Sequence, residues 1–146
     1  MEIPRGARRL PRRDLALTAV ALGVLAAVEL GLRVARLPSL SAALGVPLLT
    51  TPESPSHWVD GDQLPMWARR RLAATRRATR RWPFGDTCLR EALVAGCLIR
   101  RLDPSLRIGV AKVDGQVKAH AWIEIQGRAL DPGALSFATV HTVAGP

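Results

Sequence analysis

A chain of 146 residues with 48% hydrophobic residues and a formal net charge of +9 has room for one compact domain and a short appendage. This hydrophobic content is enough for a core and does not imply a multi-span membrane protein. The charge is uneven, because residues 1–85 hold 14 arginines against 6 acids whereas residues 86–146 hold 7 basic residues against 6 acids. The two cysteines, Cys88 and Cys97, lie too far apart on one predicted helix for an unstrained disulfide, and no His and Cys pattern has zinc spacing. We therefore expect reduced thiols, no metal, no cofactor and a cytoplasmic protein.

The first part of the chain predicts a hydrophobic helix. A basic segment, residues 1–14, precedes the apolar run LALTAVALGVLAAV, which Glu29 ends before the helical pattern continues to Leu37. A spanning helix needs about 20 apolar residues, so a core or docking helix is favoured. A signal peptide, or association of residues 15–37 with a membrane, is the alternative, because a basic start and a short apolar core are also the outline of a signal.

Residues 38–66 contain most of the turn-forming residues of the chain and predict a short helix followed by a linker. We therefore expect an N-terminal region of apolar helix and linker, residues 1–66, and a second domain, residues 67–146.

Residues 64–82 predict an amphipathic helix, because Leu64, Leu72, Ala78 and Trp82 fall on one stripe at helical spacing. No aromatic residues alternate with the basic ones on the other face, so we expect a solvated or peptide-facing surface and no nucleic-acid binding. This face carries Arg69, Arg70, Arg76, Arg77, Arg80 and Arg81.

The sequence WPFGD ends that helix, and Asp86 or Thr87 is expected to cap a second one over residues 88–101. The apolar period then changes from that of a helix to that of a strand. It predicts strands at residues 106–113 and 117–125 with a turn at Asp114-Gly115, and a third antiparallel strand at residues 128–131 after Gln126-Gly127. The expected class is α+β, with N-terminal helices and then a Cys-bearing helix packed on a small antiparallel sheet.

Three residues of this arrangement fit a catalytic triad. Cys88 begins a helix, where unpaired N–H groups and the helix dipole favour a thiolate. Strand alternation puts His120 on a polar face, and the Gln-Gly turn brings Asp131 within reach of it. A thiol nucleophile needs a base, and the base needs an acceptor that fixes its tautomer. We therefore predict that Cys88 is the nucleophile, His120 the base and Asp131 the orienting acid.

Other interpretations stay open at this point. A free cysteine is among the most often buried residues, so composition alone makes Cys88 a core residue. The chain is then a non-catalytic basic scaffold. Glu124 is the alternative third member of the triad, because it shares the strand face of His120. The remaining thiol is expected to be structural and the other histidines lack comparable partners: Cys97, His57 and His141.

Two stretches, CLREALVAGCLIRRL and IGVAKVDGQVKAHAWIEIQGRALDPG, resemble the transglutaminase-like cysteine protease domain of the leader peptidases of lasso peptide maturation. The resemblance implies a transglutaminase- or papain-like fold. It also implies a peptidase that removes the leader from a ribosomally made precursor, so that a separate cyclase can close the macrolactam ring. By motif position it gives Cys88, His120 and Asp131 the roles of nucleophile, base and orienting acid.

The resemblance also implies partners. Because residues 1–66 are expected to be helix and linker, it indicates the split form, which acts with a separate leader-recognition protein on the precursor peptide, and with the lasso cyclase as a further partner. An acyl transferase or amidase that uses the same thiolate is an alternative, as is a scaffold in the same assembly.

Overall fold

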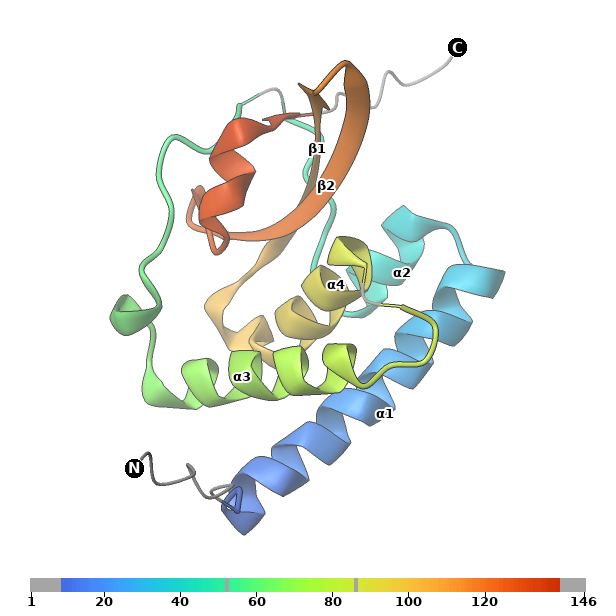
Figure 1. Ribbon diagram of the computed structural model, residues 1–146, viewed down its shortest axis with the longest axis vertical. Helices are drawn as coiled ribbons and strands as arrows, with labels where there is room; N and C mark the ends of the chain where they lie inside the picture. Colours follow the sequence, from blue (N-terminus) through green and yellow to red (C-terminus); the bar gives the residue numbers. More distant parts are fainter. Residues whose placement is uncertain (1–8, 52, 86, 140–146) are drawn as a thin grey trace, which may run out of the picture.

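The computed structural model describes residues 9–51, 53–85 and 87–139, in which helices precede a small sheet, as in the predicted α+β class (Figure 1). The helices are α1 (Arg12–Val34), α2 (Leu37–Ala43), α3 (Met66–Arg80) and α4 (Cys88–Leu98), with the short 3-10 helices η1 (Gly61–Gln63), η2 (Arg100–Leu102) and η3 (Pro132–Ser136). The strands are β1 (Ser105–Val113), β2 (Gln116–Ile125), β3 (Arg128–Ala129) and β4 (Ala138–Thr139).

Helices α1, α3 and α4 pack against one another, and the other side of α4 packs on β2 (Figure 1). Ala21, Ala74 and Ala78 are fully buried, and such small side chains let helices approach closely. One core cluster runs from Leu25 of α1 to Ile123 of β2. Residues on both sides of the boundary predicted at residue 66 therefore contribute to the same core.

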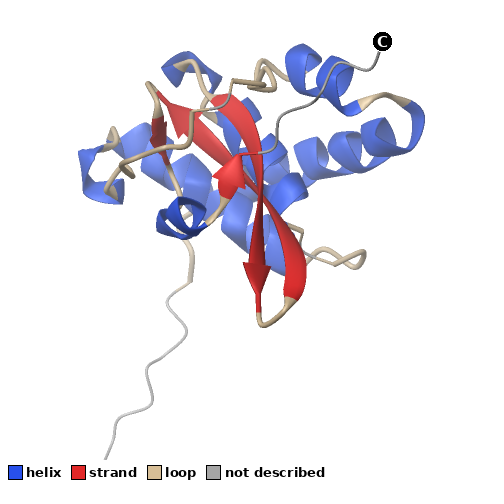
Figure 2. Ribbon diagram, turned by 90° about the horizontal axis from the view of Figure 1, so that it is seen from above, coloured by secondary structure: helices blue, strands red, loops and turns tan. Residues whose placement is uncertain are grey.

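The sheet is antiparallel with the order β3-β2-β1-β4 and lies in front of the helices in Figure 2. Both predicted turns occur. Asp114 and Gly115 have φ of 50° and 80°, and Gln126 and Gly127 have φ of 51° and 74°, so each pair adopts the left-handed geometry of a tight hairpin turn. Strand β3 is shorter than the predicted 128–131, and β4 was not predicted.

Part of the segment predicted as a linker is held against the sheet, and we call its residues 46–51 and 53–59 the strap. The Leu106 N–H of β1 donates to the Pro47 carbonyl (2.9 Å), and the Val59 N–H donates to the Ala129 carbonyl of β3 (2.8 Å). These backbone hydrogen bonds fix the strap at both ends, so it is part of the fold.

Among the described residues, α1 is the helix long and apolar enough to cross a membrane. The core helix of a soluble protein and a signal sequence meet the same criteria of length and composition. Ala21, Leu25 and Val28 of α1 are fully buried against the rest of the protein.

Candidate active site

His120 and Asp131 are joined by a hydrogen bond of 2.5 Å between Nε2 and Oδ2, as the strand register predicted. Strand β2 carries His120, and Asp131 is the N-cap residue of η3. The second oxygen of Asp131, Oδ1, accepts from the Gly133 N–H (2.9 Å). The chain leaves the sheet after Ala129 because Asp131 begins this turn, and the cap fixes the carboxylate toward the imidazole.

The hydrogen bond to Asp131 also decides which nitrogen of His120 is available. When the Nε2–H group donates to the carboxylate, the lone pair of Nδ1 is left to accept a proton. The imidazole is confined between two rings, with centroids 5.9 Å from Trp122 and 5.0 Å from Phe137. Its side chain is 22% exposed, so water reaches it on a limited side.

Cys88 is the first residue of α4, as predicted. Thr87 is the N-cap residue, and its hydroxyl accepts from the Arg90 N–H (3.4 Å); Asp86, the other predicted cap, lies outside the described residues. The Glu91 N–H makes the first helical hydrogen bond, to the Thr87 carbonyl (3.0 Å). The N–H groups ahead of it belong to the unpaired first turn of the helix, beside the thiol.

Cys88, His120 and Asp131 line one pocket of about 310 Å³. Helix α4 packs on the face of β2 that carries Ala121 and Ile123, whereas His120 is on the other face. Strand β3 pairs with β2 only at residues 124–125, which leaves the edge of β2 open beside His120. Consecutive residues from 120 to 123 line the pocket, so it reaches both faces of the strand around this open edge. The remaining lining residues are Leu72, Thr75, Arg76, Glu91, Ala92, Ala95, Leu130 and Pro132.

Among the described residues the thiol of Cys88 is not hydrogen-bonded to His120; the two side chains share the pocket. Catalytic hydrogen bonds are often long in the absence of substrate and shorten when it binds. Within the described ranges no group of three or more His, Cys, Asp or Glu side chains is arranged to hold a metal ion.

Glu124, the alternative acid, is engaged elsewhere. Its carboxylate makes two hydrogen bonds with Arg107, from Nε (2.8 Å) and Nη2 (3.0 Å), and accepts a third from Trp122 Nε1 (3.0 Å). Arg107 Nη1 donates to the Thr51 carbonyl of the strap (2.6 Å). This buried network anchors the indole that packs on His120. The face of β2 predicted to be polar is therefore covered.

A second network reaches the mouth of α4 from α1. Arg90 Nε donates to Glu29 Oε2 (2.6 Å), and Arg90 Nη1 donates to the Thr87 hydroxyl (3.1 Å). Hydrogen bonds from Arg90 lower the pKa of Glu29 below its ordinary value, against the opposing effect of burial. Glu29, which interrupts the apolar run of the sequence, thus connects α1 to the residue before Cys88.

Cys97 and His57, two of the other sequence candidates, do not line the pocket. Cys97 is a free, partly buried thiol, and burial raises its pKa. His57 is exposed in the strap, where Nδ1 lies 2.7 Å from the hydroxyl of Ser56. His141 lies outside the described residues.

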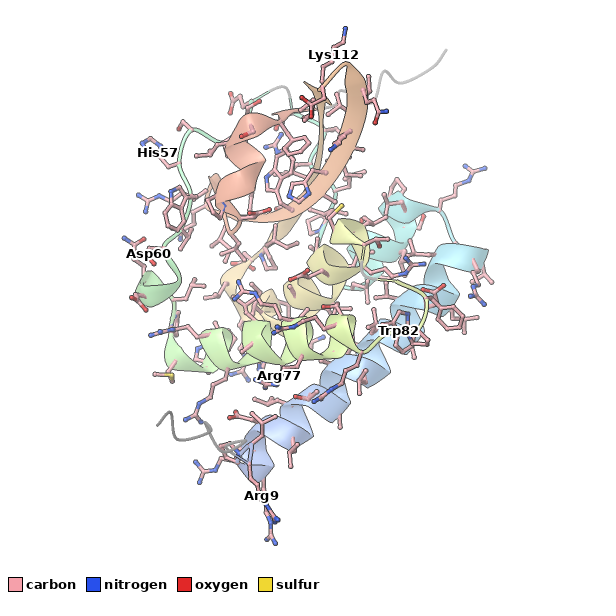
Figure 3. The ribbon with its side chains drawn as sticks, in the orientation of Figure 1. Arg9, His57, Asp60, Arg77, Trp82 and Lys112 are labelled. Carbon is pink, nitrogen blue, oxygen red and sulfur yellow. The ribbon has the colours of Figure 1, made fainter. Side chains whose placement is uncertain are left out.

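The arginine face of α3 is only partly solvated. Arg77 Nε donates to the Thr18 hydroxyl of α1 (3.0 Å), and in Figure 3 Arg77 lies on the side of α3 next to α1. Arg76 lines the pocket. The expectation of a solvated surface is therefore wrong for Arg77, because α1 covers that side of the helix.

Sequence analysis missed the two ion-pair networks. The available signal was a charge inside an apolar pattern: Arg107 within β1 and Glu29 within α1. Burying an unpaired charge is so costly that each such residue predicts a partner, but its identity depends on which elements pack together.

The sequence profile of the transglutaminase-like superfamily matches residues 24–142, a range that includes Cys88, His120 and Asp131. The chain therefore belongs to the transglutaminase-like superfamily, which includes cysteine peptidases. The match begins within α1, ahead of the boundary predicted at residue 66. No curated protein and no solved structure is significantly similar to the chain.

Proposed function

We propose that the protein is the leader peptidase of a lasso peptide pathway. It hydrolyses the bond between leader and core of a ribosomally made precursor, and acts with a separate leader-recognition protein before a cyclase closes the ring. Membership of the transglutaminase-like superfamily, which includes cysteine peptidases, supports the thiol chemistry of the proposal. The resemblance of the Cys-helix and AHAW stretches to this peptidase family supplies the substrate.

The observation that carries the proposal is the His120–Asp131 hydrogen bond in a pocket that Cys88 also lines. It holds the imidazole in the tautomer whose Nδ1 accepts a proton. A buried structural cysteine has no need of such a base. Cys97, the other cysteine, does not line this pocket.

In the proposed reaction Nδ1 of His120 takes the proton of Cys88, and the thiolate attacks the carbonyl carbon of the scissile peptide bond. The imidazolium, stabilised by Asp131, then protonates the leaving amine, which is the amino end of the core peptide. Water, deprotonated by the same imidazole, hydrolyses the thioester and releases the leader with a free carboxylate.

The first turn of α4 supplies an oxyanion site in this proposal. The backbone N–H of Cys88 precedes the first helical hydrogen bond and lies beside the carbon that the thiolate attacks. The helix dipole favours negative charge there, both on the thiolate and on the tetrahedral intermediate.

The test is mass spectrometry of a cognate precursor peptide incubated with its recognition protein and each of three proteins: wild type, Cys88→Ala and Cys97→Ala. We expect wild type and Cys97→Ala to release the leader and Cys88→Ala to be inactive with an unchanged thermal unfolding midpoint. Cleavage by all three proteins would refute a thiol mechanism.

The same assay separates the alternatives. With a primary amine in excess, an acyl transferase gives a leader whose mass includes the amine, whereas a peptidase gives a leader with a free acid. An amidase that acts on a side chain gives a free acid without separating leader from core. A scaffold would bind the precursor and cleave it in none of the three samples.

A further inference from the structure

Helix α1 has a bare apolar face opposite the one that packs in the core. Leu15, Val20, Leu30 and Val34 are 51%, 53%, 63% and 77% exposed. The residues between them on this side are also exposed and apolar: Ala16, Ala19, Gly23, Ala26 and Ala27. We call this set the outer face of α1. A helix that is apolar all round is normally enclosed on every side, so we expect the outer face to be covered by a binding partner or a membrane.

Among the described residues of α1 and its two ends, the exposed charges beside the outer face are positive. Arg12 and Arg13 at one end and Arg36 just beyond the other are exposed. Arg12 stands about five full turns from Leu30 and so shares its side of the helix. The acids of the helix lie off this side: Glu29 is buried, and Asp14 falls on the inner side by helical spacing. In Figure 3 Arg9 extends from the same end of α1 as Arg12.

This arrangement fits a lipid surface better than a protein. Protein interfaces are enriched in aromatic anchors, and the residues of the outer face include none. It has aliphatic side chains that hydrocarbon can accept, and guanidinium groups, which bind phosphate well, at both ends.

We propose that α1 docks the protein on an anionic membrane, lying in the plane of the lipid interface. The helix does not span the bilayer in this proposal, because its other side is committed. Leu25 and Val28 are fully buried in the core, and Glu29 is paired with Arg90. Lying flat, the 23-residue helix places about 34 Å of apolar face on the lipid.

The docked orientation leaves the pocket accessible. In Figure 1 α1 is the outermost helix, and the sheet lies on the other side of α3 and α4. The residues that line the pocket come from α3, α4, β2 and the segment after β3, and none of them comes from α1, so the pocket is not built from the docked helix. Membrane docking in this form is independent of the chemistry at Cys88 and goes beyond the proposed peptidase activity.

The test is cosedimentation of the full chain with vesicles of phosphatidylcholine, with and without phosphatidylglycerol. We expect binding to the anionic vesicles that falls with added salt. The double variant Val20→Asp/Leu30→Asp should bind more than about tenfold more weakly, because two apolar contacts are lost. Val117→Asp is the matched control, since Val117 is 75% exposed on the hairpin and should bind like wild type.

Wild-type protein that stays in the supernatant, or a double variant that binds like wild type, would overturn the proposal. Equal binding to neutral vesicles would overturn the anionic assignment. Sedimentation equilibrium in the absence of lipid tests a second copy as the occupant: a wild-type dimer that Leu30→Asp converts to a monomer would also overturn it. If the double variant does not fold, Leu30→Asp and Arg12→Glu each serve alone, with the expected weakening in the same direction.

Discussion

The Arg107–Glu124 ion pair allows a quantitative test of how much this buried network, which anchors the indole beside His120, stabilises the fold. The two side chains are 5% and 2% exposed and make two direct hydrogen bonds. Removing one partner of a buried pair costs about 3–5 kcal/mol, because the other charge stays buried and uncompensated. In Arg107→Met we therefore expect a fall in Tm of about 6–20 °C, at about 2–4 °C per kcal/mol for a chain of this size.

The double variant Arg107→Met/Glu124→Gln tests whether the loss of stability comes from the uncompensated charge. The Gln oxygen still accepts from the Trp122 indole, and neither charge remains, so the double variant should be more stable than Arg107→Met alone. Urea unfolding, followed by tryptophan fluorescence, measures each corner of the cycle. If the two single effects add to within about 0.5 kcal/mol, the pair is not coupled as the structure indicates.

Three further predictions use other parts of the molecule. The folded-state pKa of Glu29 is lowered, so the stabilisation from its carboxylate is present above the ordinary value of 4.5 and is lost as pH falls through the lowered pKa. The Glu29→Gln variant lacks this carboxylate, so its free energy of unfolding, measured with urea, should decline less over this range than that of wild type. Gly96→Ala should lower Tm, because the added Cβ would lie 2.7 Å from a methyl group of Val46. Gly23→Ala is the control: its Cβ would have no atom within 4 Å, so it should stabilise α1 by about 0.5–1 kcal/mol. Equal changes in Tm for the two variants would contradict this packing. At neutral pH iodoacetamide should modify Cys88 before Cys97, whose pKa burial raises, and peptide mapping gives both rates.

Local signals in the sequence were sufficient for most of the fold. The Asp114-Gly115 turn and the Gln126-Gly127 turn both have the backbone geometry that such dipeptides favour. The second of these turns sets the register that puts Asp131 beside His120. Thr87 ends up as the cap of α4 because its hydroxyl suits the first turn of a helix. These features depend on neighbours in the chain, which is why they could be predicted.

Long-range packing accounts for what could not be predicted. The strap has the composition of a linker, and only the exposed backbone of β1 and β3 makes it part of the sheet. Arg77 belongs to an arginine-rich face, yet α1 covers it. The partner of Glu29 is Arg90, which lies 61 residues away on another helix, and no local pattern encodes that separation.

The order of the site along the chain has a consequence for synthesis. The helices that position Cys88 are complete at Leu98, whereas the imidazole and its carboxylate arrive with β2 and η3. At about 5–20 residues per second, Asp131 is made roughly 2–9 s after Cys88. Throughout that interval the nascent chain holds the thiol without an oriented base. The ribosome therefore delivers the acid–base pair last, and a chain that stops before Leu130 lacks its orienting carboxylate.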